Sequence, residues 1–287
     1  MSLVIHTATK SQYRRLIDNP PHGLLINGAD GVGKTAIAQQ LIAEILNISI
    51  DKLTAYPYFL QVTAMTNSIS IDTAREIKHF FELKTIGTQT IRRGILIEHA
   101  ESLTIEAQNA LLKTIEEPPA DSIIVLTVGH EQLLLPTIVS RLQRFTVHRP
   151  KDEETLAYFS ALINDPVKVT SALAISNGLP GLAHAILFLE EHPLLLGIEK
   201  AKTFLRASKF TRLNLIDEYV QQKDSLLMIM QALLRIAESS LHKAAQKEDG
   251  KSIQQWEKIL TATYQAENSL LLNAQSKLVL NNLILEL

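Results

Sequence analysis

The eight residues from Gly28 to Thr35 limit the folds that this chain can adopt. They read GADGVGKT and match the pattern G-x-x-x-x-G-K-[S/T]. The segment follows a short apolar run, GLLING at 23–28, and precedes a segment with apolar residues at helical spacing. A strand, a glycine-rich loop and a helix in this order predict a phosphate-binding loop in an α/β domain. A chance glycine turn is the alternative, and the order of the three elements disfavours it.

The residue types of this loop suit a polyphosphate. Glycines let backbone amides turn toward the phosphates, and the start of the following helix adds its positive dipole end. Lys34 is expected to reach the β- and γ-phosphates, and the Thr35 hydroxyl to ligate magnesium. The expected cofactors are therefore ATP and magnesium. The expected nucleotide contacts in the loop are Gly28, Ala29, Asp30, Gly31, Val32, Gly33, Lys34 and Thr35.

Short apolar runs alternate with helical segments through the first 150 residues. Besides the run before the loop, strands are predicted at 58–62, 94–98, 122–128 and 144–148. Helices are predicted after the loop, from about Asp72 and from Thr104. Continuous apolar strands separated by helices are typical of a parallel sheet that is covered on both faces. The predicted fold class is α/β, a doubly wound domain.

The pattern changes after Pro150. Residues 151 to about 195 predict short helices that are interrupted by SNGLPG at 176–181. Beyond residue 200 there is no proline and a single glycine, Gly250, while Leu, Ala, Gln, Lys and Glu dominate. This composition favours helix throughout. The chain is therefore expected to have three parts, 1–150, 151–200 and 201–287.

Composition excludes several classes of site. The 28 basic and 30 acidic residues give a net charge of −2, which argues against nucleic-acid binding by bulk electrostatics alone. There is no cysteine, so neither a disulfide nor a thiolate zinc site is expected. The apolar runs are far shorter than the roughly 20 residues of a membrane span, and the first ten residues do not resemble a signal peptide. We expect a cytoplasmic location and no membrane contact.

An acidic side chain at the end of another strand completes such a phosphate site, because it holds the magnesium shell. Glu98 ends the predicted strand at 94–98 and is the candidate, with His99 next to it. An ATP-hydrolysing site of this type places Asp and then Glu here, and the second acid polarises the attacking water. His99, with a reference pKa of about 6.5, could accept a proton but lacks the charge of a carboxylate. The sequence therefore predicts that nucleotide binds and is hydrolysed poorly.

Two stretches beyond the loop resemble the AAA+ clamp loaders. NALLKTIEEPP at 109–119 resembles their NALLKxLEEPP signature. Ser140 and Arg141 resemble the start of their Ser-Arg-Cys motif, with Leu142 in the place of the cysteine. The sequence EHA at 98–100 is more similar to the delta-prime subunits of bacterial DNA polymerase III than to the gamma/tau ATPase subunits. The resemblance covers most of the chain and is most specific up to residue 150.

This resemblance implies an AAA+ core at 1–150, a helical lid at 151–200 and a helical collar at 201–287 that assembles a five-subunit ring. Arg141 would be an arginine finger for the ATP site of a neighbouring gamma/tau subunit, and Thr127 the first nucleotide sensor. The implied partners are the gamma/tau and delta subunits, with the sliding clamp and primer-template DNA bound by the whole complex. Alternatively, Arg141 is a solvated residue at a helix end and Thr127 an ordinary strand residue.

The chain departs from the family pattern at three places. The second sensor arginine is missing, since Gly181 and Leu182 stand in its region. The acidic pair is altered at Glu98 and His99, and the cysteine cluster that binds zinc in many relatives is absent. The first two departures favour a delta-prime subunit that donates its arginine and turns over little nucleotide. An ATP-hydrolysing gamma/tau-type subunit is the alternative, and a P-loop kinase would leave the helical tail unexplained.

Two smaller patterns concern the ends of elements. The arginines that flank the predicted strands, Arg92, Arg93, Arg144 and Arg149, are expected to lie in solvent. Alternatively, Arg144 and Arg149 form a basic strip with Arg141 toward DNA or a partner's nucleotide. Pro118 is expected to end the preceding helix, because a residue before proline is pushed out of the helical region.

Overall fold

The computed structural model describes residues 4–64, 68–188, 193–221 and 223–287, so the first three residues of the chain lie outside it. The chain divides into two compact units, a first unit at Met1–Glu154 and a second unit at Thr155–Leu287. The boundary falls close to the change of pattern after Pro150. The expected separation of a lid from a collar near residue 200 stays a prediction.

The first unit is built on a five-stranded sheet with the strand order β2-β3-β4-β1-β5. Each neighbouring pair is parallel, as predicted. All seven residues of β4 are buried, because this strand lies in the middle of the sheet with helices on both faces. The strands are β1 (Gly23–Asn27), β2 (Phe59–Val62), β3 (Arg93–Ile97), β4 (Ser122–Val128) and β5 (Gln143–Thr146).

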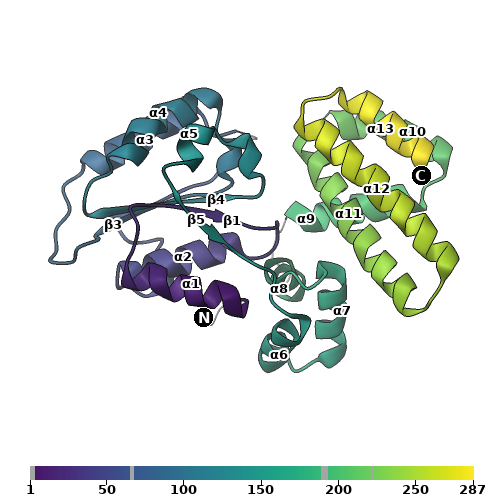
Figure 1. Cartoon of the computed structure of the whole chain (residues 1–287), viewed down its shortest axis with the longest axis horizontal. Coiled ribbons are helices and arrows are strands. Elements are labelled where there is room, and N and C mark those ends of the chain that lie inside the picture. The colour runs from purple at the N-terminus through teal and green to yellow at the C-terminus, as the bar shows by residue number, and fades with distance from the viewer. Residues whose placement is uncertain (1–3, 65–67, 189–192, 222) are drawn as a thin grey trace. The chain divides into compact units, whose positions relative to one another are not determined.

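Helices cover the sheet on both sides (Figure 1). On one face lie α1 (Thr7–Asp18) and α2 (Lys34–Ile45), and on the other lie α3 (Ile71–Glu82), α4 (Ile105–Glu116) and α5 (Pro136–Val139). The short 3-10 helices η1 (Ile50–Lys52), η2 (Ala100–Ser102) and η3 (Glu131–Leu133) lie in the connections. Helix α1 was not predicted, because its sequence TATKSQYRRLID carries too few apolar residues to show a helical period.

Helix α4 illustrates how local sequence sets the bounds of an element. The hydroxyl oxygen of Thr104 accepts the amide N–H of Ala107 at 3.2 Å and caps the start of the helix. The apolar face with Ala107, Leu111 and Ile115 is buried, as its spacing predicts. The helix ends at Glu116, two residues before Pro118, which confirms the predicted stop.

The second unit contains helices and no strand among the residues that the structure describes, as predicted. The break predicted at 176–181 follows α7, where Asn177 and Gly178 take left-handed backbone conformations and end the helix. Helix α11 packs against α9 and α12, and α13 packs against α10 and α12. The helices are α6 (Asp152–Leu162), α7 (Pro166–Ser176), α8 (Pro180–Phe188), α9 (Pro193–Arg206), α10 (Lys209–Val220), α11 (Lys223–Gln246), α12 (Gly250–Leu271) and α13 (Ser276–Glu286).

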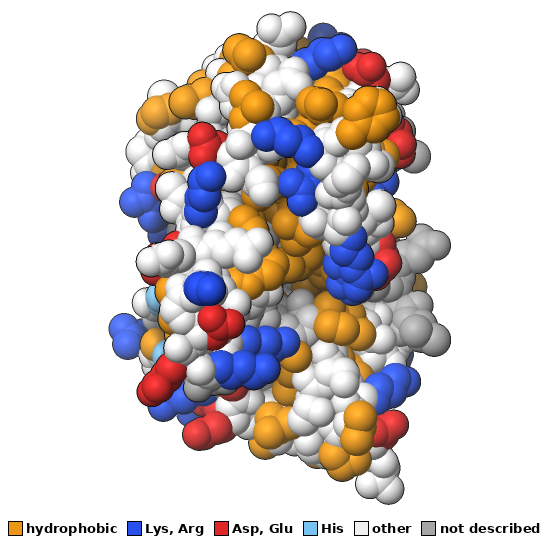
Figure 2. Space-filling model, turned by 90° about the vertical axis from the view of Figure 1, so that its right-hand side faces the viewer, with side chains coloured by type: hydrophobic (Ala, Val, Ile, Leu, Met, Phe, Trp, Pro, Cys, Tyr) orange, Lys and Arg blue, Asp and Glu red, His pale blue; other side chains and the backbone are white. Residues whose placement is uncertain are grey.

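Apolar side chains remain on the surface of the second unit. On the face shown in Figure 2, they gather between Lys and Arg side chains. The exposed large apolar residues of this unit include Leu196, Phe210, Tyr264, Leu272 and Leu278. In the part of the chain that the structure describes, no helix is long and apolar enough to span a membrane.

Arg93 lies inside the first unit, so the prediction that it is solvated was wrong. Its side chain is 6% exposed and donates to the carbonyl oxygens of Phe80, Phe81 and Leu83 at 3.2, 2.6 and 2.9 Å. These carbonyls belong to the last turn of α3 and to its C-cap Leu83, where C=O groups lack the partner four residues on that a helix interior supplies. Arg93 therefore fastens the end of α3 to the start of β3.

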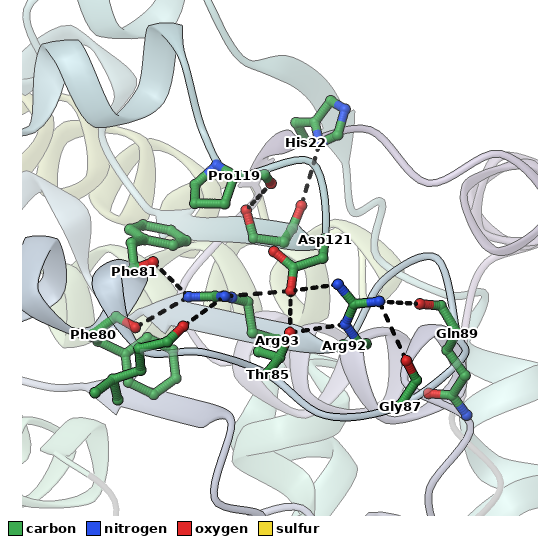
Figure 3. A network of polar contacts seen from close by, with 12 residues as sticks. His22, Phe80, Phe81, Thr85, Gly87, Gln89, Arg92, Arg93, Pro119 and Asp121 are labelled. Atoms are coloured by element: carbon green, nitrogen blue, oxygen red, sulfur yellow. Dashed lines mark hydrogen bonds and ion pairs between the residues drawn. The ribbon is translucent and has the colours of Figure 1, made fainter.

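Asp121 joins Arg93 to the neighbouring Arg92 (Figure 3). One of its carboxylate oxygens lies 3.3 Å from the guanidinium of Arg93 and 3.2 Å from that of Arg92. Thr85 donates its hydroxyl to the same oxygen, and Arg92 also donates to Thr85 at 2.8 Å. Burial opposes the ionisation of Asp121, but the hydrogen bond from Thr85 and the charges and hydrogen bonds of the two arginines lower its pKa below the ordinary value.

We predict that Asp121→Asn lowers the free energy of unfolding by about 2 kcal/mol at neutral pH, because two cations lose their counter-charge. Since the pKa of Asp121 is lowered on folding, its contribution is present above the unfolded value of about 3.9 and is lost as the pH falls through the folded value. Urea unfolding from pH 3 to pH 8 measures the difference. A deficit that does not shrink toward pH 3 would contradict the assignment.

Candidate functional site

The loop at Gly28–Thr35 has the backbone shape of a phosphate cradle. It leaves the carboxyl end of β1, where a Cβ on Gly28 would lie 2.8 Å from the carbonyl oxygen of Val147, so only glycine fits. Gly31 and Gly33 have φ values of 83° and 96°, which favour glycine. Gly33 is the N-cap of α2, and no side chain caps this helix start. The first amides of α2 are therefore available to an anion.

Lys34 is already paired within the loop. Its Nζ donates to the carbonyl oxygen of Gly28 and to Oδ1 of Asp30, both at 2.8 Å. The side chains of Lys34 and Asp30 are 6% and 19% exposed. Burial opposes the ionisation of Asp30, but the charge and hydrogen bond of Lys34, helped by His99 and His130, lower its pKa below the ordinary value. Asp30 is therefore an anion held against the lysine.

Thr35 and Glu98 meet at the start of α2, as the sequence predicts. The Thr35 hydroxyl donates to Oε2 of Glu98 at 2.8 Å. The other carboxylate oxygen, Oε1, accepts from the Gln61 amide and from the Thr63 hydroxyl, the latter at 3.0 Å. Gln39 donates to the amide oxygen of Gln61 at 3.0 Å and so turns its NH₂ toward Glu98. Both oxygens of Glu98 thus accept hydrogen bonds from neighbouring side chains.

Sequence reasoning missed Gln61. Its signal was a single polar residue inside the apolar strand FLQV. That signal identifies no partner, because the neighbour of β2 depends on the strand order.

His99 and Thr127 lie together at the carboxyl ends of β3 and β4. His99 has φ 49°, and its backbone N–H donates to the Thr127 hydroxyl oxygen at 3.1 Å. Nδ1 of His99 lies 3.6 Å from Oε1 of Glu101. The hydrogen bond to Glu101 raises the pKa of His99, and the negative charges of Glu101 and Asp30 raise it further. Partial burial and the positive charge of Lys34 oppose this rise. Thr127 is 1% exposed, and its role as a sensor stays a prediction.

Glu101 was not predicted, yet it lies within the site. Its Oε1 accepts the backbone N–H of Gly129 at 3.0 Å, while Oε2 is buried and finds no hydrogen-bond partner in the structure. A Cβ on Gly129 would lie 2.9 Å from Oδ1 of Asp30 and 3.1 Å from Oε1 of Glu101. Glycine at this position therefore leaves room for two carboxylates.

Arg141 lies at the amino ends of the strands, whereas the loop lies at their carboxyl ends. It follows α5 and precedes the start of β5, and its carbonyl oxygen lies 3.8 Å from the position of a Cβ on Gly23. Gly23 begins β1, whereas Gly28 follows its last residue, so a strand about 16 Å long separates the two places. The side chain is 36% exposed, pairs with Glu116 of α4 and donates to the carbonyl oxygen of Thr137 at 2.7 Å.

The residues of the loop fit a magnesium nucleotide. The cradle supplies uncapped amides, Lys34 lies among them, and Thr35 and Glu98 present oxygens beside the helix start. Magnesium in such a site takes few protein ligands and keeps several waters. Among the described residues, no three His, Asp or Glu side chains form a group that could hold a metal ion by themselves.

Comparisons with a family model and with known proteins both find subunits of DNA polymerase III. A family model described as "DNA polymerase III, delta subunit" matches residues 7–151, about half of the chain. The delta' subunit of DNA polymerase III from Pseudomonas aeruginosa is 30% identical over 178 residues, which cover 55% of this chain and 53% of that protein. The delta' subunit from Haemophilus influenzae is 28% identical over 241 residues, which cover 75% and 71%. The chain thus aligns with about half of the first relative's length.

A solved structure is similar in fold to nearly the whole chain. The DNA polymerase III gamma subunit-related protein of Thermotoga maritima superposes with a TM-score of 0.52 at 22% identity, covering 96% of this chain and 97% of that protein. The shared fold therefore extends through both units.

We predict that the imidazole of His99 titrates above about 6.5, because Glu101 stabilises its protonated form. The stabilisation is present below pH 6.5 and is lost as the pH rises through the folded pKa. NMR titration of the histidine ring protons measures this value, and Glu101→Gln is expected to lower it while the histidine signals outside the site stay unchanged. A His99 pKa that does not respond to Glu101→Gln would refute the pairing.

Proposed function

The chain belongs to the DNA polymerase III delta-subunit family, and from this premise we propose that it acts as a delta-prime subunit of a clamp loader. In this role it assembles with gamma/tau and delta subunits into a hetero-oligomer that loads a sliding clamp on primed DNA. The delta' relatives and the family match support the proposal. The subunit serves the complex as a binding partner that completes a neighbouring site.

The observation that carries this proposal is the position of Arg141. A guanidinium is always charged and planar, and it stabilises the charge that develops on a γ-phosphate. Arg141 lies on the surface of the first unit, at the sheet edge away from the chain's own loop. Since it cannot act in its own site without crossing the sheet, we propose that it acts in the ATP site of a gamma/tau neighbour.

The chain's own site is proposed to bind ATP and magnesium and to hydrolyse ATP poorly. Lys34, Thr35 and Glu98 supply the binding groups, and magnesium would neutralise phosphate charge there. No carboxylate follows Glu98, and His99 faces Glu101. Leu182, in the region of a second sensor, is completely buried and cannot replace an arginine. These features support weak turnover.

The lid is proposed at 151–200, where all but its first four residues belong to the second unit, and the collar at 201–287. Neighbouring subunits would cover exposed apolar residues such as Phe210, Leu272 and Leu278. Thr127 is proposed to sense nucleotide through His99, whose backbone it holds.

We predict that Arg141→Ala lowers the clamp- and DNA-stimulated ATPase of the reconstituted complex at least about tenfold, since an arginine finger can contribute about 10³–10⁵ to such a rate. Arg141→Lys is expected to restore only part of the rate, because lysine lacks the planar fork. Steady-state phosphate release, measured with subunit assembly verified by gel filtration, tests this.

Two matched variants separate catalysis from structure. Glu116→Gln breaks the ion pair of Arg141 but keeps the arginine, and Arg144→Ala removes a nearby exposed arginine that pairs with Glu131. Both are expected to retain nearly full ATPase activity. If Glu116→Gln abolished activity as Arg141→Ala does, the arginine would act by joining α4 to α5. Unchanged activity of Arg141→Ala would remove the proposal.

A further inference from the structure

We propose that Asp30 is an internal inhibitor of nucleotide binding, a carboxylate that occupies Lys34 and must be displaced before a polyphosphate can enter the loop. This inference rests on the proposed nucleotide site and adds a regulatory residue to it. Asp30 belongs to the loop itself, four residues before Lys34.

The contacts of Lys34 show what an incoming phosphate would meet. An ammonium group has three N–H donors, and two of them are directed to Gly28 and Asp30 at 2.8 Å. The lysine is 6% exposed, so its charge is screened little by water and its attraction for the carboxylate is stronger than at the surface. A phosphate that binds Lys34 therefore has to compete with an anion already in contact.

The surroundings of Asp30 place its carboxylate among the strand ends that border the loop. Oδ1 lies 2.9 Å from the position of a Cβ on Gly129, which follows the last residue of β4. Lys34, His99 and His130 favour the ionised form of Asp30, and Oε1 of Glu101 lies 3.1 Å from the same Cβ position of Gly129. Ligands of open parallel sheets bind at these carboxyl ends. Asp30 thus holds negative charge in the region expected to receive phosphate.

Release of the inhibitor is geometrically simple. Asp30 is more exposed than Lys34, so a rotation of its side chain would return the carboxylate to water while the lysine stays in the cradle. The loop would then have a closed form with Lys34 paired and an open form that accepts phosphate. If at least nine-tenths of the molecules are closed, the apparent affinity is about tenfold weaker than that of the open form.

The test compares nucleotide binding by the full chain and by Asp30→Asn and Asp30→Ser. Binding of fluorescent N-methylanthraniloyl-ATP with magnesium is measured by titration, together with the melting temperature with and without ATP. Both variants are expected to bind at least about tenfold more tightly. Without nucleotide they are expected to melt at lower temperature, because Lys34 loses its counter-charge, and with ATP to gain more than the wild type does.

The controls assign the effect to the pair in the loop. Asp72→Asn removes a carboxylate that pairs with Arg75 at 2.7 Å on the surface of α3, and it is expected to change neither affinity nor the response to ATP. Adding Lys34→Ala to Asp30→Asn is expected to abolish the gained affinity. Equal affinity of the wild type and both Asp30 variants, or failure of all three to bind, would overturn the inference. Neither result would bear on Arg141, whose test is the ATPase of the assembled complex.

Discussion

Strand β1 runs parallel to β4 on one side and to β5 on the other, and this alignment decides where each group of the site can lie. Its carboxyl end leads into the loop, beside the ends of β3 and β4 that carry Glu98 and Thr127. Its amino end lies next to the start of β5, which Arg141 precedes. The glycine-rich loop therefore lies at the carboxyl ends of the strands, and Arg141 lies at their amino ends. In the proposed role, Arg141 would meet a nucleotide in the site of a second subunit.

The cradle itself shows why a sequence pattern does not establish an activity. The pattern specifies backbone shape, because glycines permit the turns and the helix start supplies amides. It does not specify what the lysine and the acidic residue contact. Here Lys34 is paired with Asp30, and both oxygens of Glu98 accept hydrogen bonds from side chains. A nucleotide would have to replace contacts that the protein already makes with itself.

Much of the first unit could be predicted from the sequence, because its strands are continuous apolar runs that need no partner to be recognised. Lys34, Thr35 and Glu98 could be singled out from the sequence because each follows a strand at a fixed spacing, and their binding roles stay predictions. Glu101 and Gln61 were missed, since their contacts arise between segments that the strand order brings together. The roles of Arg141 as an arginine finger and of Thr127 as a nucleotide sensor stay predictions.

The error at Arg93 has a related cause. Arginine is usually exposed, and the expectation followed from its residue type. The end of α3 offers three carbonyl groups, however, and Asp121 offers a charge, so the guanidinium is satisfied inside the protein. Helix α1 was not predicted, because it has few apolar residues and these are buried only when the helix packs on the sheet.

The most direct measurement is an experimental structure of the assembled complex with a γ-phosphate analogue bound to the gamma/tau subunits. The account predicts that the guanidinium of Arg141 leaves Glu116 and lies within hydrogen-bond distance, about 3 Å, of the analogue on the neighbouring subunit. An Arg141 that stays paired with Glu116 and far from every nucleotide would contradict it.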